Sequence, residues 1–279
     1  MPQPANGRIT LESPAPGYVL ATITNPPINL ADPEFFADLR EVLDVLEADD
    51  ETRVLVFESS NPDYFIAHFD VVKGAEMEHP VGPTGLPLIP DLSTRMTQAP
   101  FATIAKIRGR ARGYGSEFLL ACDMRFASRE QAVMSQIEVG FGLWPGGGGT
   151  ERLPHIVGRS RALEIVLSSD DMDGDLAERY GYVNRTLPDA ELDAFVDRLA
   201  RRIASFDRPA VAKAKELINH SSPLPAGEDL VAAQDAFFAR FTWEGLQRRL
   251  GQVFEMGFQQ AGDTEYRLGE VIGELGAGK

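Results

Sequence analysis

Two glutamates, Glu117 and Glu138, stand next to apolar residues and close to segments that are rich in glycine. A carboxylate that is kept from water has its pKa raised from about 4.3 toward the range in which it can exchange protons near neutral pH. Two such groups can divide the work, because one takes a proton while the other gives one. The same residues could instead cap helices or form ion pairs, and the spacing alone leaves both interpretations open.

The first glycine-rich segment, residues 109–115, directly precedes the apolar residues 117–122. Backbone N–H groups at the start of a helix are unpaired and lie at the positive end of its dipole. They can therefore face an oxygen on which negative charge develops during a reaction. A tight turn from strand to helix, with glycine needed only for space, is the alternative interpretation.

Neither this segment nor the second glycine run, residues 140–149, fits a nucleotide-binding motif. A Walker A loop requires a lysine after its last glycine, whereas Gly149 is followed by Thr150. The GxGxxG fingerprint fails at its last position in both segments, at Phe118 and at Pro145. Ser116 also lacks the flanking glycines of the GxSxG motif. The sequence therefore argues against phosphoryl transfer, hydride transfer and α/β-hydrolase chemistry.

The composition is that of a globular protein, with 279 residues of which 43% are hydrophobic and 25% are charged. The net charge of −15, from 27 basic and 42 acidic residues, disfavours nucleic-acid binding, which needs a basic face. A single cysteine, Cys122, excludes an intramolecular disulfide framework and a thiolate zinc site, and the four separated histidines form no HExxH pair, so we expect no metal. Because no signal peptide or membrane-spanning run is found, we expect a cytoplasmic enzyme without a membrane partner.

The first sixty residues predict a strand, a helix and a strand. Residues 8–24 alternate well enough between apolar and polar side chains to form strands. Asp32 and Pro33 then provide a helix N-cap and a proline at the first helical position. A continuous apolar run at 54–57 indicates a strand that is buried on both faces. This order is that of a parallel crossover unit, and therefore of an α/β protein.

The same pattern recurs further along the chain. An apolar helix is predicted at 117–122, between strands at 101–107 and 124–127. One more strand is predicted at 183–187. The remaining helices are predicted at 150–168, 189–205, 209–220 and 229–258.

Two further segments contain proline and interrupt the predicted helices and strands. Residues 74–90 predict a long surface loop, of the kind that often forms a lid or stays disordered. Residues 206–209, Phe-Asp-Arg-Pro, separate the α/β part from the helical tail. We therefore expect an α/β core over 1–205 and a C-terminal helical region over 206–279.

Taken together, these segments resemble the enoyl-CoA hydratase/isomerase family, also called the crotonase superfamily, over most of residues 15–190. Phe65–Asp70 stands in the place of the family's F-x-A-G-A-D motif, and residues 107–123 match V-x-G-x-A-x-G-G-G-x-E-L followed by Cys-Asp. Residues 136–150 match P-E-x-x-x-G-x-x-P-x-x-G-G-T, and Ala177–Val183 is similar to A-x-x-x-G-L-V. The order and spacing of these motifs make a chance agreement implausible.

The resemblance implies a fold, a substrate and an assembly. The fold would be a crotonase-like spiral of ββα units, with C-terminal helices that mediate trimer formation. The substrate would be an acyl-CoA thioester, so that coenzyme A enters as part of the substrate and no separate cofactor is needed. The assembly would be a homotrimer or a dimer of trimers.

The resemblance also implies the roles of particular residues. Glu117 and Glu138 fall on the two acid/base glutamates of the hydratases, and the backbone N–H groups of Phe69 and Tyr114 would form an oxyanion hole for the thioester oxygen. Because both glutamates are retained, we expect an enoyl-CoA hydratase that adds water across the 2,3 double bond. An enoyl-CoA isomerase, an acyl-CoA hydrolase or a catalytically silent oligomeric interaction protein are the alternatives.

Several residues near the expected site depart from the family pattern. His68 replaces a glycine, and it could act as a further general base, donate a hydrogen bond to the substrate, or pack half-exposed on the CoA channel. Arg112 could bind an acidic acyl group or a CoA phosphate, or form an ordinary ion pair. Trp144 would line the acyl pocket or pack into the core. The residues expected to contact the substrate are Ala67, His68, Arg112, Gly115 and Trp144.

Overall fold

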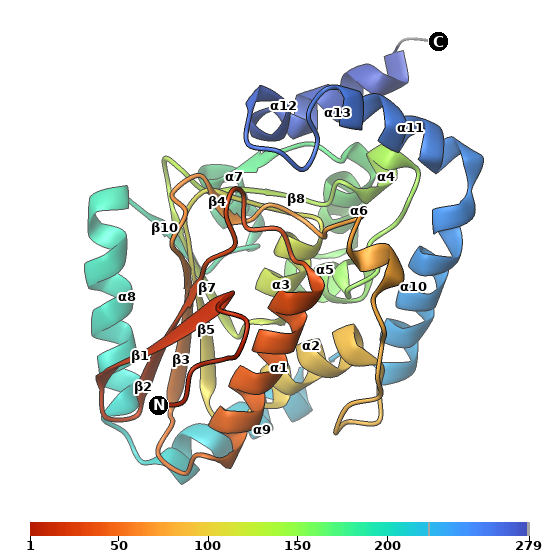
Figure 1. The fold of residues 1–279 in the computed structure, drawn as a ribbon. Helices are drawn as coiled ribbons and strands as arrows, with labels where there is room; N and C mark the ends of the chain where they lie inside the picture. Colours follow the sequence, from red (N-terminus) through yellow and green to blue (C-terminus); the bar gives the residue numbers. More distant parts are fainter. Residues whose placement is uncertain (223, 278–279) are drawn as a thin grey trace.

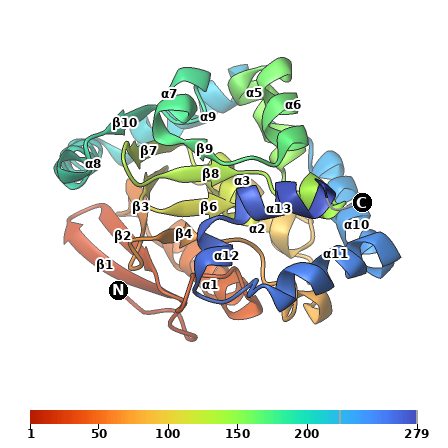
Figure 2. The same ribbon diagram turned by 90° about the horizontal axis from the view of Figure 1, so that it is seen from above.

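The protein, described here by a computed structural model over residues 1–222 and 224–277, is built around two β-sheets (Figures 1 and 2). The larger sheet has six strands in the order β1-β2-β3-β5-β7-β10. Its first two strands are antiparallel and the others are parallel, with Tyr18 opposite Val54 and Val54 opposite Ala102. The strands are β1 Ile9–Ala15, β2 Tyr18–Ile23, β3 Val54–Ser59, β5 Ala102–Ile107, β7 Met124–Ser128 and β10 Arg185–Leu187.

The smaller sheet has four strands in the order β4-β6-β8-β9, each only two or three residues long. Strands β4, β6 and β8 are parallel, and β9 is antiparallel to β8. The strands are β4 Tyr64–Ile66, β6 Arg110–Arg112, β8 Val133–Ser135 and β9 Met172–Asp173. None of these strands was predicted from the sequence, and residues 109–115, expected to be a turn, contain β6 and the start of a helix.

Helices cover both faces of the larger sheet (Figure 1). On one face lie α1 (Pro33–Ala48), α2 (Leu88–Gln98) and α3 (Tyr114–Ala121), and on the other lies α8 (Asp189–Ala204). As predicted, α1 begins at Pro33, where the side chain of Asp32 accepts a hydrogen bond from the Phe35 N–H at 2.9 Å. The apolar side chains of these helices meet those of β3, β5 and β7, which forms the main core.

The middle of the chain forms short helices rather than the long one that was predicted. The expected helix 150–168 is two helices, because Gly158 adopts a φ of +81° between them. The expected loop 74–90 is shorter than predicted, since α2 begins at Leu88 and a 3₁₀ turn, η1, occupies Gly74–Glu76. The helices of this part are α4 Glu138–Phe141, α5 Gly149–Val157, α6 Arg159–Ser168 and α7 Gly174–Tyr180.

The C-terminal helices lie against the side of the molecule where the smaller sheet ends (Figure 2). The predicted helix 229–258 is interrupted after Ala239, where a 3₁₀ turn, η2, covers Arg240–Thr242. The two helices that follow residue 258 were not predicted. The C-terminal helices on this side are α10 Gly227–Ala239, α11 Glu244–Glu255, α12 Asp263–Tyr266 and α13 Leu268–Ala277, whereas α9 Arg208–Ser221 lies away from them, against α2 and β5 (Figure 1).

The structure confirms the expected α/β class with C-terminal helices. The division of the chain at residue 205 stays a prediction. Across residues 1–222 and 224–277, no helix has both the length and the apolar composition needed to cross a bilayer.

Candidate active site

The three parallel strands of the smaller sheet all end where the expected site residues begin. Residues 67–69 follow β4, Tyr114 opens α3 two residues after β6, and Glu138 opens α4 three residues after β8. The carboxyl ends of adjacent parallel strands lie at one edge of a sheet, which is where open α/β folds commonly bind ligands. The topology therefore brings together three segments that are far apart in the sequence.

Glycine allows the start of α3 to approach β4 closely. A Cβ atom at Gly115 would lie 2.1 Å from the Ile66 carbonyl oxygen, so no side chain fits there. Gly113, the residue before the helix, adopts a φ of +50°, and a Cβ there would lie 2.9 Å from Oε1 of Glu138. The glycines of this segment thus set both the helix position and its distance from the second glutamate.

Glu117 is held inside the protein by two backbone donors. Its side chain, on α3, is 3% exposed, and its Oε1 atom accepts hydrogen bonds from the N–H groups of Gly147 at 2.7 Å and Gly149 at 2.9 Å. Burial raises the pKa of Glu117 to about 7, against the opposing effect of these two hydrogen bonds. The second glycine run therefore serves to fix a carboxylate, and the sequence alone gave no sign of this contact.

Glu138 is buried without such donors. Its residue is 7% exposed, and no hydrogen-bond partner of its Oε2 atom occurs among the described residues. Burial, together with repulsion from Glu117, raises the pKa of Glu138 well above its ordinary value. The two carboxyl groups line one cavity of about 30 Å³, so the structure brings together the pair that the sequence singled out.

The expected oxyanion donors line the same cavity. Phe69 and Tyr114 both contribute to its wall, and within the described chain no acceptor is recorded for the N–H of either residue. The peptides on both sides of Phe69 are fixed by Ala31, whose N–H donates to the His68 carbonyl at 2.9 Å and whose carbonyl accepts from the Asp70 N–H at 3.0 Å. Two N–H groups beside two carboxyl groups are the parts that an enolate-forming reaction requires.

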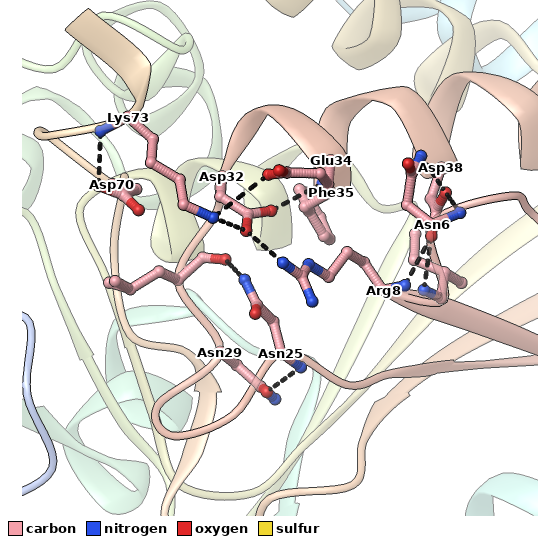
Figure 3. A network of polar contacts seen from close by, with 12 residues as sticks. Asn6, Arg8, Asn25, Asn29, Asp32, Glu34, Phe35, Asp38, Asp70 and Lys73 are labelled. Carbon is pink, nitrogen blue, oxygen red and sulfur yellow. Dashed lines mark hydrogen bonds and ion pairs between the residues drawn. The ribbon is translucent and has the colours of Figure 1, made fainter.

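A network of charged side chains supports the loop that carries Phe69 (Figure 3). Asp32 accepts hydrogen bonds from Arg8 at 3.0 Å and from Lys73 at 3.1 Å, and the Asp70 carboxylate accepts from the N–H of Lys73 at 3.0 Å. Burial alone would raise the pKa of Asp32, but its hydrogen bonds to Phe35, Arg8 and Lys73 lower that pKa below its usual range. The start of α1 is thereby tied to the loop after β4.

His68 and Arg112 are engaged within the protein. His68 is 2% exposed rather than half-exposed, and both of its ring nitrogens have protein partners, which leaves none for a general base. Arg112 is 0% exposed and forms two hydrogen bonds with the Asp171 carboxylate, at 2.7 and 2.6 Å. The ion-pair interpretation of Arg112 therefore fits the structure, and the two substrate-binding interpretations do not.

The other expected contact residues lie outside the cavity. Trp144 is 37% exposed and neither lines the acyl cavity nor packs into the core; it lies in a surface cleft with Thr150 and Glu151. The Ala67 carbonyl accepts from the Arg112 N–H at 3.2 Å. Ala67 and Gly115 are both buried, and neither lines this cavity.

Aromatic residues that the sequence did not point out complete the cavity. Phe237 and Phe238, near the end of α10, and Ile89 of α2 line it together with Phe69. A second cavity of about 40 Å³ adjoins it and has an apolar wall that includes Phe141. The sequence of α10 alone indicates a core helix. Only the fold shows that the end of α10 reaches the two glutamates.

The comparison with known families decides the classification. The sequence profile described as enoyl-CoA hydratase/isomerase matches residues 16–253. The chain belongs to the enoyl-CoA hydratase/isomerase family. This result confirms the resemblance stated above and makes the protein an enzyme of that family.

Individual relatives of this hydratase/isomerase-family chain support the assignment. A crystal structure of a protein from Streptomyces avermitilis named "putative enoyl-CoA hydratase" is 45% identical, covers 96% of both chains and superposes with a TM-score of 0.90. The short-chain-enoyl-CoA hydratase of Clostridium acetobutylicum is 29% identical over 226 residues, which is 81% of this chain and 86% of that protein. A mitochondrial protein of Dictyostelium discoideum named "probable enoyl-CoA hydratase" is 37% identical over 138 residues, half of each chain.

Proposed function

We propose that the protein is an enoyl-CoA hydratase, which adds water across the 2,3 double bond of an enoyl-CoA thioester. The observation that carries the proposal is that the buried Glu117 and Glu138 line one cavity with Phe69 and Tyr114, whose N–H groups have no acceptor among the described residues. The names of the relatives from Streptomyces and Clostridium support the same reaction.

The environments of the two glutamates suggest how they divide the proton transfers. Glu117, with a pKa of about 7 and two backbone donors on Oε1, is partly ionised at neutral pH and can act as the base. Glu138 has no donor on Oε2 within the described part of the chain and is repelled by the charge of Glu117, which raises its pKa, so it can act as the acid. The pair titrates as a unit, and a site of this kind works in a limited pH range.

In the proposed reaction, Glu117 accepts a proton from water as the water oxygen bonds to C3. The electron pair of the double bond moves toward the thioester oxygen, where the N–H groups of Phe69 and Tyr114 stabilise the enolate. Glu138 then donates its proton to C2, and the thioester carbonyl forms again. The site is reset when the proton on Glu117 passes to the ionised Glu138.

The size of the cavity bears on how the substrate enters. A volume of about 30 Å³ has room for a water molecule but not for an acyl group. Phe237 and Phe238 therefore have to move aside when the thioester binds. We propose that the acyl chain then extends toward the adjoining apolar cavity beside Phe141. A homotrimer or dimer of trimers in the cytoplasm remains part of the proposal on the family resemblance alone.

The experiment is a comparison of three reactions in the purified protein: hydration of crotonyl-CoA, isomerisation of a 3-enoyl-CoA, and hydrolysis of the thioester. We expect hydration to be the fastest, and we expect Glu117→Gln and Glu138→Gln each to lower its kcat by roughly 10²–10⁴-fold. Glu164→Gln on the outer surface of α6 is the matched control and should retain full activity. Faster isomerisation or hydrolysis would reassign the reaction, and full activity in both site variants would refute the roles of the glutamates.

A further inference from the structure

A buried contact joins the loop after β4 to the C-terminal part of the chain. The Nε2 atom of His68 lies 2.9 Å from Oε1 of Glu265, a residue of α12 that is 0% exposed. The Nδ1 atom of the same ring lies 2.9 Å from the carbonyl oxygen of Phe69. The imidazole also stacks on the Phe258 ring, with 4.5 Å between centroids and 11° between planes.

The partners of this imidazole fix its orientation. A carbonyl oxygen only accepts hydrogen bonds, so Nδ1 of His68 donates to the Phe69 carbonyl. Burial would raise the pKa of Glu265, but the contact with His68 and a hydrogen bond from the Gln259 N–H at 2.6 Å lower it overall. The Glu265 carboxyl group thus holds the other side of the His68 ring, at Nε2.

This pair is the centre of a larger contact made by residues 258–266, which we call the C-terminal clasp. The Gln259 side chain accepts from the Val71 N–H at 3.2 Å and donates to Asp70 Oδ1 at 2.8 Å. Arg112 of β6 donates to the Glu265 carbonyl at 2.7 Å. The C-terminal clasp thus binds the ends of two strands of the smaller sheet, beside which α12 lies in Figure 2.

We propose that His68 is a positioning residue, whose ring is anchored on Glu265 and holds the Phe69 backbone so that its N–H faces the reacting thioester oxygen. The Ala31 backbone contacts the peptides on both sides of Phe69, and the His68 ring adds a second hydrogen bond to the peptide after it. The C-terminal clasp is then part of the catalytic apparatus. The inference rests on the proposed function, because it assigns a purpose to the oxyanion donor of that reaction.

The test separates positioning from stability. His68→Phe keeps an aromatic ring on Phe258 but removes both hydrogen bonds and leaves the buried Glu265 carboxylate without its His68 partner. We expect Tm to fall by roughly 10 °C. For the folded protein we expect kcat for crotonyl-CoA to fall about 100-fold with KM nearly unchanged, because a displacement of about 1 Å in a catalytic group has an effect of this size.

The double variant His68→Phe/Glu265→Gln decides between the two explanations. It removes the unpaired charge and keeps an oxygen for the Gln259 N–H, so most of the lost Tm should return. A positioning role predicts that kcat stays low in the double variant. Recovery of kcat together with Tm would overturn the proposal, as would unchanged kcat in His68→Phe. Glu47→Gln, which weakens the ion pair of the buried Arg95 at 2.9 Å and lies away from the C-terminal clasp, is the control and should lower Tm but not kcat.

Two measurements keep the inference distinct from the proposed reaction and from failure of a variant to fold. Acetoacetyl-CoA carries negative charge on its thioester oxygen when it ionises to the enolate, so its affinity and enolate absorbance report on the oxyanion donors without turnover. Weaker enolate binding in the double variant would support positioning even if the wild-type protein hydrated nothing. Nitrogen-15 NMR of wild-type His68 should show a proton on Nδ1 at pH 7, and a ring without a proton on Nδ1 would refute its hydrogen bond to the Phe69 carbonyl.

Discussion

The two sheets of the protein divide its tasks. The six-stranded sheet is covered by helices on both faces and carries most of the apolar core, whereas the four-stranded sheet has strands of two or three residues. Yet the shorter strands lead directly into the site, through Phe69, Tyr114 and Glu138. The difference suggests that stability depends mainly on the larger sheet and catalysis mainly on the ends of the smaller one.

The largest expected effect is a loss of stability from the larger sheet. Phe126 of β7 is 4% exposed and packs against Phe195 of α8, on the face away from the site. We expect Phe126→Ala to lower the free energy of unfolding by about 3–5 kcal/mol in denaturant titrations, with kcat per folded molecule unchanged. Phe195→Ala, which truncates the half-buried partner, should cost less. A drop in kcat in Phe126→Ala would show that the two sheets are not separable.

The second prediction concerns Glu117, which lowers stability because it is buried. The Glu117 carboxyl group keeps its proton up to about pH 7 in the folded chain, but only up to about pH 4.5 in the unfolded chain. The free energy of unfolding therefore falls as pH rises between these values. The difference between these two pKa values corresponds to roughly 3 kcal/mol in the free energy of unfolding. We expect Glu117→Gln to be inactive but more stable than wild type at pH 8, with the advantage vanishing near pH 4. Urea unfolding of the variant and the wild type at both pH values measures this difference in stability. The control Glu164→Gln should be as stable as the wild type at both.

The sequence predicted the two sheets unequally, for a physical reason. Strands β3, β5 and β7 have apolar runs long enough to show their burial, and the N-cap Asp32 marks the start of α1. A strand of three residues has no measurable periodicity, so β4, β6 and β8 could not be predicted from pattern. Their place in the fold depends on pairing with one another.

The candidate site shows the same limit. The family motifs pointed to Glu117 and Glu138, and the structure places both on one cavity. The partners that fix the site, such as Gly147 for Glu117 and Glu265 for His68, are 30 and 197 residues away in the sequence. A contact over such distances leaves no local signal. Arg112 and Trp144 were singled out by residue type, and tertiary packing placed them outside the cavity.

The third prediction tests whether the ends of the smaller sheet act on catalysis more than on stability. Gly115→Ala places a Cβ against the Ile66 carbonyl, so the first turn of α3 has to move away from β4. We expect kcat for crotonyl-CoA to fall about 100-fold, because Tyr114 and Glu117 move with that turn. Gly251→Ala in α11, where a Cβ meets no atom within 4 Å, is the matched control. Equal activity in the two variants would show that the site tolerates the displacement.

The smallest expected effect concerns the aromatic wall that closes the cavity. Phe237 lines both cavities, and its ring meets that of Phe69 edge-on with 6.0 Å between centroids. Phe237→Ala opens room beside the glutamates and should therefore favour longer acyl chains. The gain should be modest, because an added methylene changes the fit to a hydrophobic pocket only weakly. We expect the ratio of kcat/KM for an eight-carbon to a four-carbon enoyl-CoA to rise about tenfold. Phe241→Ala removes a neighbouring ring that lines neither cavity, so it should leave the ratio unchanged. An equal rise in both variants would show that the packing of α10 as a whole, rather than the Phe237 side chain, determines the preference for acyl-chain length.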